Sequence, residues 1–283
     1  MTPVLVDIGA NLAHDSFNRD REPVLNRARE AGVGTIIVTG SSRESALRAR
    51  DLCRRDVSSA LVGAHASPTE NNATIPRLFS TAGLHPHHAT EWNADLAATF
   101  RELAADPVVV SLGECGLDYF RNYSPHEAQR AAFEAQLALA IELKKPLFLH
   151  QRDAHADFIA ILRAHRKDLR EVCVHCFTDT AAALEDYLAL DCYIGITGWI
   201  CDERRGKPLY DLAARIPDDR VMVETDAPYL LPRTAPKVSE RRNEPAFLPY
   251  VVRTLAQARK ADEAHVARIT AENARRFFHL PEA

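Results

Sequence analysis

Eight short apolar runs alternate with amphipathic segments along the chain, and this alternation constrains the fold more than any other feature. The runs are rich in Val, Ile and Leu, as is typical of strands buried on both faces. They occupy residues 4–8, 35–39, 79–82, 108–112, 147–150, 172–175, 192–196 and 221–224. Helical patterns lie between or after them, at residues 21–30, 44–54, 95–104, 125–143, 154–166, 180–190, 207–215, 249–259 and 262–278. Strands that alternate with helices predict a parallel sheet, and this number of strands fits a closed (β/α)8 TIM barrel.

The same pattern leaves a doubly wound open sheet as the alternative architecture. The chain has 283 residues, of which 46% are hydrophobic, and this is ample for one large core. Residues 56–78 interrupt the alternation with Pro, Asn, Ser and Thr, over a stretch longer than the usual connection of about 4–6 residues. We therefore expect a single domain over residues 1–283, with a surface insertion at 56–78.

Composition and charge exclude several other classes of protein. No apolar run approaches the roughly 20 residues that span a bilayer, and no basic segment precedes the first apolar run, so we expect a cytoplasmic protein without a membrane partner. Six cysteines in a chain of this length do not make a disulfide scaffold, and no second C-x-x-C joins Cys173 and Cys176 in a zinc ribbon. The net charge of −4 gives no global basic field. No heptad pattern is sustained, so a monomer is expected.

Four of the apolar segments end in residues of the types that bind metal ions. Glu114, His150, His175 and Asp226 close the segments 108–114, 146–150, 171–175 and 221–226. In a barrel of this kind the catalytic groups sit at the carboxyl ends of the strands, so these side chains are expected to converge. Carboxylates suit Mg²⁺ and Mn²⁺, whereas imidazoles shift the preference toward Zn²⁺. Asp226 could bind the metal or accept the proton of the attacking water, and we predict Glu114 and Asp226 as the catalytic residues.

The motifs that carry these residues resemble the TatD family of metal-dependent deoxyribonucleases. They are GECGLDY at 113–119, PLFLHQRDA at 146–154, HCF at 175–177 and ETDAPYL at 224–230. GLHPH at 83–87, GITGW at 195–199, DERRG at 202–206 and RRNEP at 241–245 extend the match and resemble a bacterial branch of the family. The resemblance implies a (β/α)8 barrel of the amidohydrolase-like type. It also implies that Glu114, His150 and His175 bind metal, and that Asp226 is a ligand or the catalytic base.

The resemblance further implies the substrate. The bacterial branch is associated with Mg²⁺-dependent 3′-to-5′ exonuclease action on single-stranded DNA and RNA, and with repair of oxidative DNA damage. His85 and His87 match histidines near the substrate, and Arg152 matches a basic residue beside the metal. Phosphodiesters need cationic donors, and single strands bind aromatic platforms. The residues expected to bind the substrate are His85, His87, Arg152, Trp199, Arg204, Arg205, Arg241 and Arg242.

One departure from the family pattern concerns the number of metal ions. Most members begin with an H-x-H motif that supplies two ligands, but Gly9 and Asn11 occupy those positions here. Glycine cannot bind a metal through a side chain, and an asparagine oxygen is a weak donor. The alternative to a permanent pair of metal ions is therefore one ion held by the protein. A second ion would then arrive with the substrate phosphate.

Two other functions are compatible with the barrel. The first is a small-molecule amidohydrolase, because fold alone does not determine the reaction. The H-x-H start and the strand-end lysine of many such enzymes are missing, and this disfavours it. The second is a binding protein with a vestigial site, which the intact set of four metal-binding residues disfavours.

Overall fold

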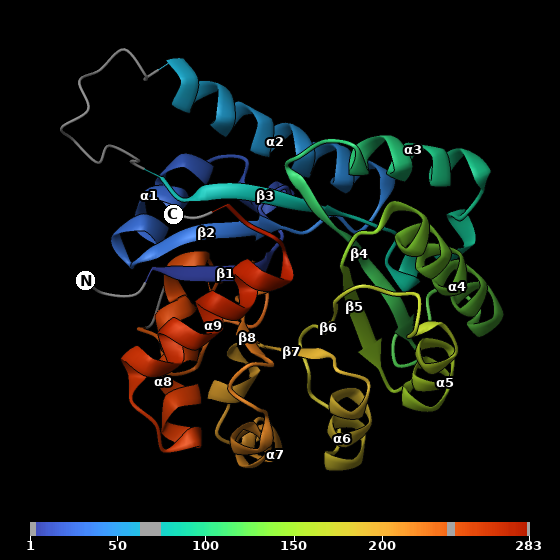
Figure 1. The fold of residues 1–283 in the computed structure, drawn as a ribbon. Helices are drawn as coiled ribbons and strands as arrows, with labels where there is room; N and C mark the ends of the chain where they lie inside the picture. The colour runs from blue at the N-terminus through green and yellow to red at the C-terminus, as the bar shows by residue number, and fades with distance from the viewer. Residues whose placement is uncertain (1–3, 63–74, 237–240, 282–283) are drawn as a thin grey trace.

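The computed structural model describes residues 4–62, 75–236 and 241–281, with the helices arranged around the strands (Figure 1). Eight parallel strands pair in the order of the sequence, so each strand neighbours the one before it. The strands are β1 Leu5–Ala10, β2 Val33–Val38, β3 Arg77–Ala82, β4 Val109–Asp118, β5 Leu147–Arg152, β6 Val172–Val174, β7 Tyr193–Ile196 and β8 Val221–Val223. The helices are α1 Arg21–Glu30, α2 Arg43–Val62, α3 Ala94–Ala104, α4 His126–Leu143, α5 His155–His165, α6 Ala181–Ala189, α7 Lys207–Leu212, α8 Leu248–Arg259 and α9 Glu263–Phe277.

The first and last strands close the sheet into a barrel. A parallel bridge joins Ala10 to Ala227, and the backbone N–H of Asn11 donates to the Ala227 carbonyl at 2.7 Å. The N–H of Asp226 donates to the Gly9 carbonyl at 2.8 Å. These contacts confirm the (β/α)8 architecture and rule out the open doubly wound sheet.

A buried carboxyl group reinforces this closure. Asp7 on β1 accepts hydrogen bonds from the Thr225 backbone N–H at 2.9 Å and from the Thr225 hydroxyl at 2.6 Å. Both residues are fully buried. The Asp7 side chain on β1 therefore accepts hydrogen bonds from polar groups just after β8, where few backbone hydrogen bonds join the two strands.

Apolar side chains fill the barrel interior and leave its other end for the site. The interior cluster takes its members from successive strands and is completed by the end of α9 with Phe277 and Phe278. Its strand residues include Val6, Ile8, Ile37, Val110, Phe148, Cys173, Tyr193 and Met222. The Phe148 ring lies 4.6 Å from the His175 ring, so the apolar core meets the polar cavity at this contact.

The structure differs from the sequence-based expectation in two places. The expected insertion at 56–78 is partly regular structure, because α2 continues to Val62 and β3 begins at Arg77, while residues 63–74 lie outside the described residues. The fourth strand continues past its apolar run to Asp118, so Glu114 lies within β4 and not at its end. Glycine permits this path, because a Cβ at Gly116 would lie 1.9 Å from the His150 carbonyl oxygen on β5.

None of the helices in the described ranges is both long enough and apolar enough to cross a membrane.

Candidate metal centre

A cavity of about 470 Å³ opens at the carboxyl ends of the strands. The four predicted metal-binding residues, Glu114, His150, His175 and Asp226, all line it. The predicted substrate-binding residues His85, His87, Arg152 and Trp199 line it as well. Residues within or just after β3, β4, β5, β6, β7 and β8 are thereby brought together, as expected for this fold.

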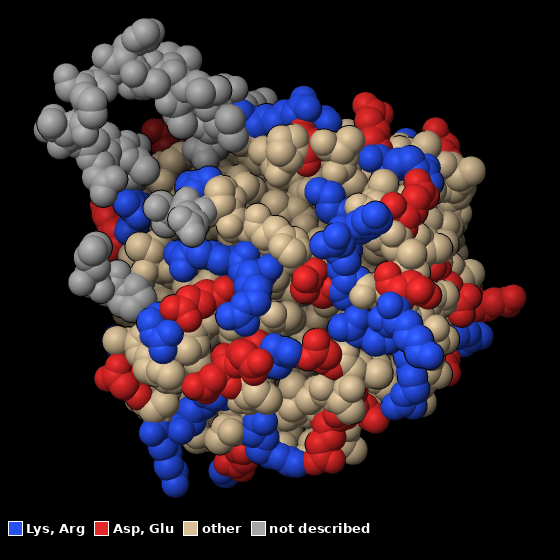
Figure 2. Space-filling view, viewed as in Figure 1, with Lys and Arg blue, Asp and Glu red and all other residues tan. Residues whose placement is uncertain are grey.

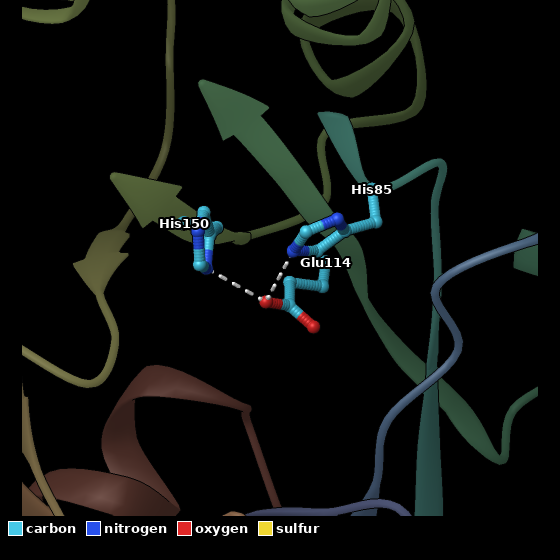
Figure 3. A group of neighbouring side chains, drawn as sticks. All are labelled: His85, Glu114 and His150. Atoms are coloured by element: carbon cyan, nitrogen blue, oxygen red, sulfur yellow. Dashed lines mark ion pairs between the residues drawn. The ribbon is translucent and has the colours of Figure 1, made fainter. Parts of the chain in front are cut away.

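The Glu114 carboxylate is the point at which three imidazoles meet. Its Oε1 lies 2.8 Å from His175 Nε2, 3.1 Å from His150 Nδ1 and 3.4 Å from His85 Nε2. The rings of His85 and His150 lie side by side, with centroids 4.5 Å apart, and both point toward this carboxylate (Figure 3). Burial alone would raise the pKa of Glu114, but the charge of His175 and the hydrogen bonds from His150 and His175 outweigh it and hold the pKa well below its usual range.

The chemistry of this group fits a divalent cation. Ligand atoms of His85, Glu114 and His150 lie within 4.8 Å of one another. His150 Nε2 is buried and has no hydrogen-bond partner among the described residues, although Asp118 Oδ2 lies 3.4 Å away. A buried nitrogen left in this state is costly unless another group, such as a cation, engages it. His85, which the sequence indicated as a substrate contact, would lie within reach of a cation held here.

Asp118 adds a second carboxylate that the sequence analysis did not single out. Its Oδ2 lies 2.9 Å from His87 Nε2, and its Oδ1 accepts the backbone N–H of Arg121 at 2.8 Å. The nearby His150 imidazole and the hydrogen bond from His87 overcome the effect of burial and lower the pKa of Asp118. The available signal was its spacing, because residues four apart on a strand point to the same face as Glu114.

Glu224 is a further buried carboxylate that the sequence analysis missed. Its Oε2 lies 3.3 Å from His175 Nδ1, and its Oε1 accepts the backbone N–H of Cys176 at 2.6 Å. Burial would lower the pKa of His175, but the charges of Glu114 and Glu224 raise it well above its usual value. An imidazole held between two carboxylates in this way has a fixed ring orientation.

Asp226 also lines the cavity and remains partly exposed to it. Asn11 Nδ2 donates to its Oδ1 at 3.1 Å. Burial, with smaller contributions from Glu114 and Glu224, outweighs the charge of His175 and raises the pKa of Asp226 to about 7. This arrangement is compatible with either predicted role, metal ligand or proton acceptor.

Gly9, where the family resemblance leads us to expect a histidine, has no room for a side chain. A Cβ at Gly9 would lie 2.5 Å from Glu224 Oε2 and 3.0 Å from the Phe148 ring. Asn11 does line the cavity, but its amide is engaged by Asp226. The space at the carboxyl end of β1 is therefore occupied by Glu224, so this strand adds no histidine to the site.

The predicted arginine rim is only partly present at the cavity. Arg152 lines it, with its guanidinium 4.0 Å above the ring of Phe120, and the sequence analysis missed Arg121, which lines it too. Four predicted substrate-binding residues are not among the lining residues that the structure describes: Arg204, Arg205, Arg241 and Arg242.

Local carboxylates explain two of these positions. Arg205 pairs with Asp202 at 3.4 Å while its guanidinium lies 5.1 Å from the Trp199 ring. Arg242 forms a bidentate pair with Asp20, at 2.8 Å and 2.5 Å. Cationic and acidic side chains are interspersed over the face seen in Figure 2, and no large basic field dominates it.

The residues that line this cavity do not support the alternative function, a small-molecule amidohydrolase. Many enzymes of that type use a lysine at a strand end, but no lysine is found among the described residues that line the cavity. The lining has carboxylates, imidazoles and two arginines, which is the chemistry expected for a metal ion and a phosphate.

Comparison with known proteins places this site in a family. The family model described as "TatD related DNase" matches residues 6–279. A protein from Erwinia tasmaniensis named "3'-5' ssDNA/RNA exonuclease TatD" is 48% identical over 277 residues, covering 98% of this chain and 100% of that protein. One of the same name from Pantoea vagans is 47% identical with the same coverage. The crystal structure of the TatD homologue YJJV from Escherichia coli has 26% identity and a TM-score of 0.84, over 99% of this chain and 100% of that one. The chain therefore belongs to the TatD-related DNase family, a family of nucleic acid hydrolases.

Proposed function

We propose that this protein is a metal-dependent exonuclease that removes nucleotides from the 3′ end of single-stranded DNA and RNA. The observation that carries the proposal is the Glu114 carboxylate, which lies 2.8–3.4 Å from three imidazoles inside an open cavity. The substrate and the polarity are supported by the printed name of the relatives that are 48% and 47% identical.

The metal would be held by residues from several strands. Glu114, His150 and His175 are the proposed ligands, Asp226 completes them as a ligand or as the base, and His85 lies within reach. The carboxylates and the family resemblance favour Mg²⁺, the imidazoles make Mn²⁺ or Zn²⁺ the alternatives, and the site would hold one or two ions. A divalent ion bound here supplies Lewis-acid polarisation of the phosphoryl group and activation of water.

The protein's own residues would orient the substrate and move the proton. Asp226 accepts the proton of the attacking water on Oδ2, because Asn11 already donates to Oδ1. Arg152 and Arg121 line the cavity, and no carboxylate of the described residues forms an ion pair with either guanidinium. Two such guanidinium groups can bind the phosphate oxygens of the strand and hold it in register.

A direct test uses one oligonucleotide labelled at either end. With Mg²⁺, the 3′-labelled strand should release labelled mononucleotide at once, whereas the 5′-labelled strand should shorten progressively. EDTA and Glu114→Ala should both abolish release. Glu142→Ala is the matched control, since Glu142 is an exposed carboxylate on α4 that pairs with Arg101. Release that survives EDTA or Glu114→Ala would refute the proposal, and release from the 5′ end would refute the polarity.

We also propose a role in the repair of oxidative DNA damage in the cytoplasm. The support is the family resemblance together with the chemistry, because a 3′ exonuclease can remove damaged 3′ termini. Expression in bacterial cells that lack such a nuclease should improve survival in hydrogen peroxide. The Glu114→Ala variant should give no improvement, and equal protection by both proteins would contradict a catalytic role in repair.

A further inference from the structure

A second cavity of about 240 Å³ adjoins the main one and shares Asn11, Ser41 and Tyr229 with it. Tyr229 lines both spaces, and Asp226, the candidate base, lines the main one, so Tyr229 lies at the boundary between the two cavities. We propose that this second cavity is a nucleobase subsite, in which one base of the single strand stacks on Tyr229. This inference rests on the proposed function and deepens it by locating a nucleotide next to the scissile phosphate.

Tyr229 has the properties of a stacking platform. Its side chain is 53% exposed, so a face of the ring is open to a ligand. Its backbone is nevertheless fixed, because its N–H donates to the Asp226 carbonyl at 3.0 Å and its own carbonyl accepts from Asn243 Nδ2 at 2.6 Å. A ring held in place with an open face loses little conformational entropy when a base stacks on it.

His14 gives the subsite a second wall with a hydrogen-bond donor. The His14 ring meets Tyr229 edge to face, with centroids 6.1 Å apart at 73°. His14 Nδ1 accepts the backbone N–H of Ser16 at 3.1 Å, so the proton of the neutral ring resides on Nε2. That N–H, together with the hydroxyl groups of Ser41 and Ser42, offers polar contacts to the edge of a base.

The charge of the second cavity favours a base over a phosphate. Its charged lining consists of Asp15, Glu44 and Arg48, with a formal sum of −1. Arg48 is already engaged, at 2.7 Å from Asp15 and 3.5 Å from Glu44. A phosphate would be repelled by the remaining negative charge, whereas a neutral base would not. The phosphate is better accommodated in the main cavity, where Arg121 and Arg152 lie.

An experiment with abasic substrates tests this assignment. Steady-state KM and kcat are measured with Mg²⁺ on single-stranded oligonucleotides that carry one abasic residue at the first, second, third or fourth position from the 3′ end. The intact chain is compared with Tyr229→Leu, which removes the ring, and with Tyr229→Phe, which keeps it. Far-ultraviolet circular dichroism and thermal melting of all three proteins show whether the substitutions leave the fold intact.

The expected result is a rise in KM for Tyr229→Leu that depends on the presence of one particular base. Tyr229→Leu should raise KM between about fivefold and about 150-fold on the intact oligonucleotide, with kcat within about twofold. Tyr229→Phe should stay within about twofold of the unsubstituted protein. The penalty of Tyr229→Leu should disappear on the one substrate that lacks the stacked base. An equal penalty on all abasic substrates, no penalty at all, or a loss of kcat at unchanged KM would overturn the subsite. Absence of nucleotide release by the unsubstituted protein would instead refute the proposed function.

Discussion

Replacing Asp7 with asparagine should make the stability of the barrel less dependent on pH. Asp7 is fully buried where β1 meets β8, and burial raises its pKa to about 7 in spite of the hydrogen bonds from Thr225 and Gly9. In the unfolded chain the same carboxyl has its usual pKa of 3.8. The folded protein therefore binds this proton more tightly than the unfolded chain does.

The sign and the size of the effect follow from this difference. The stabilising contribution of the Asp7 proton is complete below a pH of about 4 and is lost as the pH rises through 7. The full difference of about three pKa units corresponds to about 4 kcal/mol, of which about 2.5 kcal/mol falls between pH 5 and pH 8. Asparagine stays neutral throughout, so Asp7→Asn should gain about that much relative to the unsubstituted protein over the same interval.

Chemical denaturation in EDTA can measure this difference. Unfolding is followed by the fluorescence of Trp92 and Trp199 at intervals between pH 5 and pH 8, and each curve should show a single transition. Subtracting the two proteins cancels the other titrating groups, including Asp226. A difference that does not change with pH would show that Asp7 is already ionised at pH 5. A difference that moves in the opposite direction would refute the assignment of burial as the dominant cause.

Two further contrasts test the site. Glu224→Gln should weaken metal binding about 10- to 100-fold in a calorimetric titration, because the amide cannot hold the His175 ring as the carboxylate does, and unchanged affinity would contradict this role. Arg152→Ala should raise KM for an oligonucleotide and lower the salt dependence of binding by about 0.7 in log–log slope, as expected for one lost phosphate contact. Arg242→Ala should instead leave KM within about twofold. It should lower the free energy of unfolding by about 1.5 kcal/mol, because it breaks the ion pair with Asp20. An equal rise in KM for Arg152→Ala and Arg242→Ala would refute the distinction between a substrate-binding and a structural arginine.

The fold was predictable because strands buried on both faces must be apolar over their whole length. Each of the eight expected runs corresponds to a strand of the barrel. Prediction failed where polar or glycine residues continue a strand, as in β4, which extends through Glu114 to Asp118. A buried carboxylate is stable in the middle of this strand because imidazole side chains surround it. Those imidazoles come from other strands, so the sequence of one apolar run does not reveal them.

The residues of the site also divide into those that the sequence pattern indicates and those that only tertiary contacts reveal. Glu114, His150, His175 and Asp226 could be found because each follows its own apolar run, and the structure lines one cavity with all four. Glu224 was missed because its partners His175 and Cys176 are 49 and 48 residues away in the chain. Arg242 was predicted to bind the substrate because its ion-pair partner could not be seen in the sequence. That partner, Asp20, lies 222 residues away in the chain. A cluster of like charges in sequence does not reveal which of them are already paired.

Metal stoichiometry tests the central claim most directly. Calorimetric titration with Mg²⁺ or Mn²⁺ in the presence of a nucleoside monophosphate should show at least one ion bound per chain. Glu114→Ala should abolish that binding, because Glu114 Oε1 is the atom shared by His85, His150 and His175. Fewer than one ion per chain in the unsubstituted protein, or undiminished binding by Glu114→Ala, would contradict a metal centre built on this carboxylate.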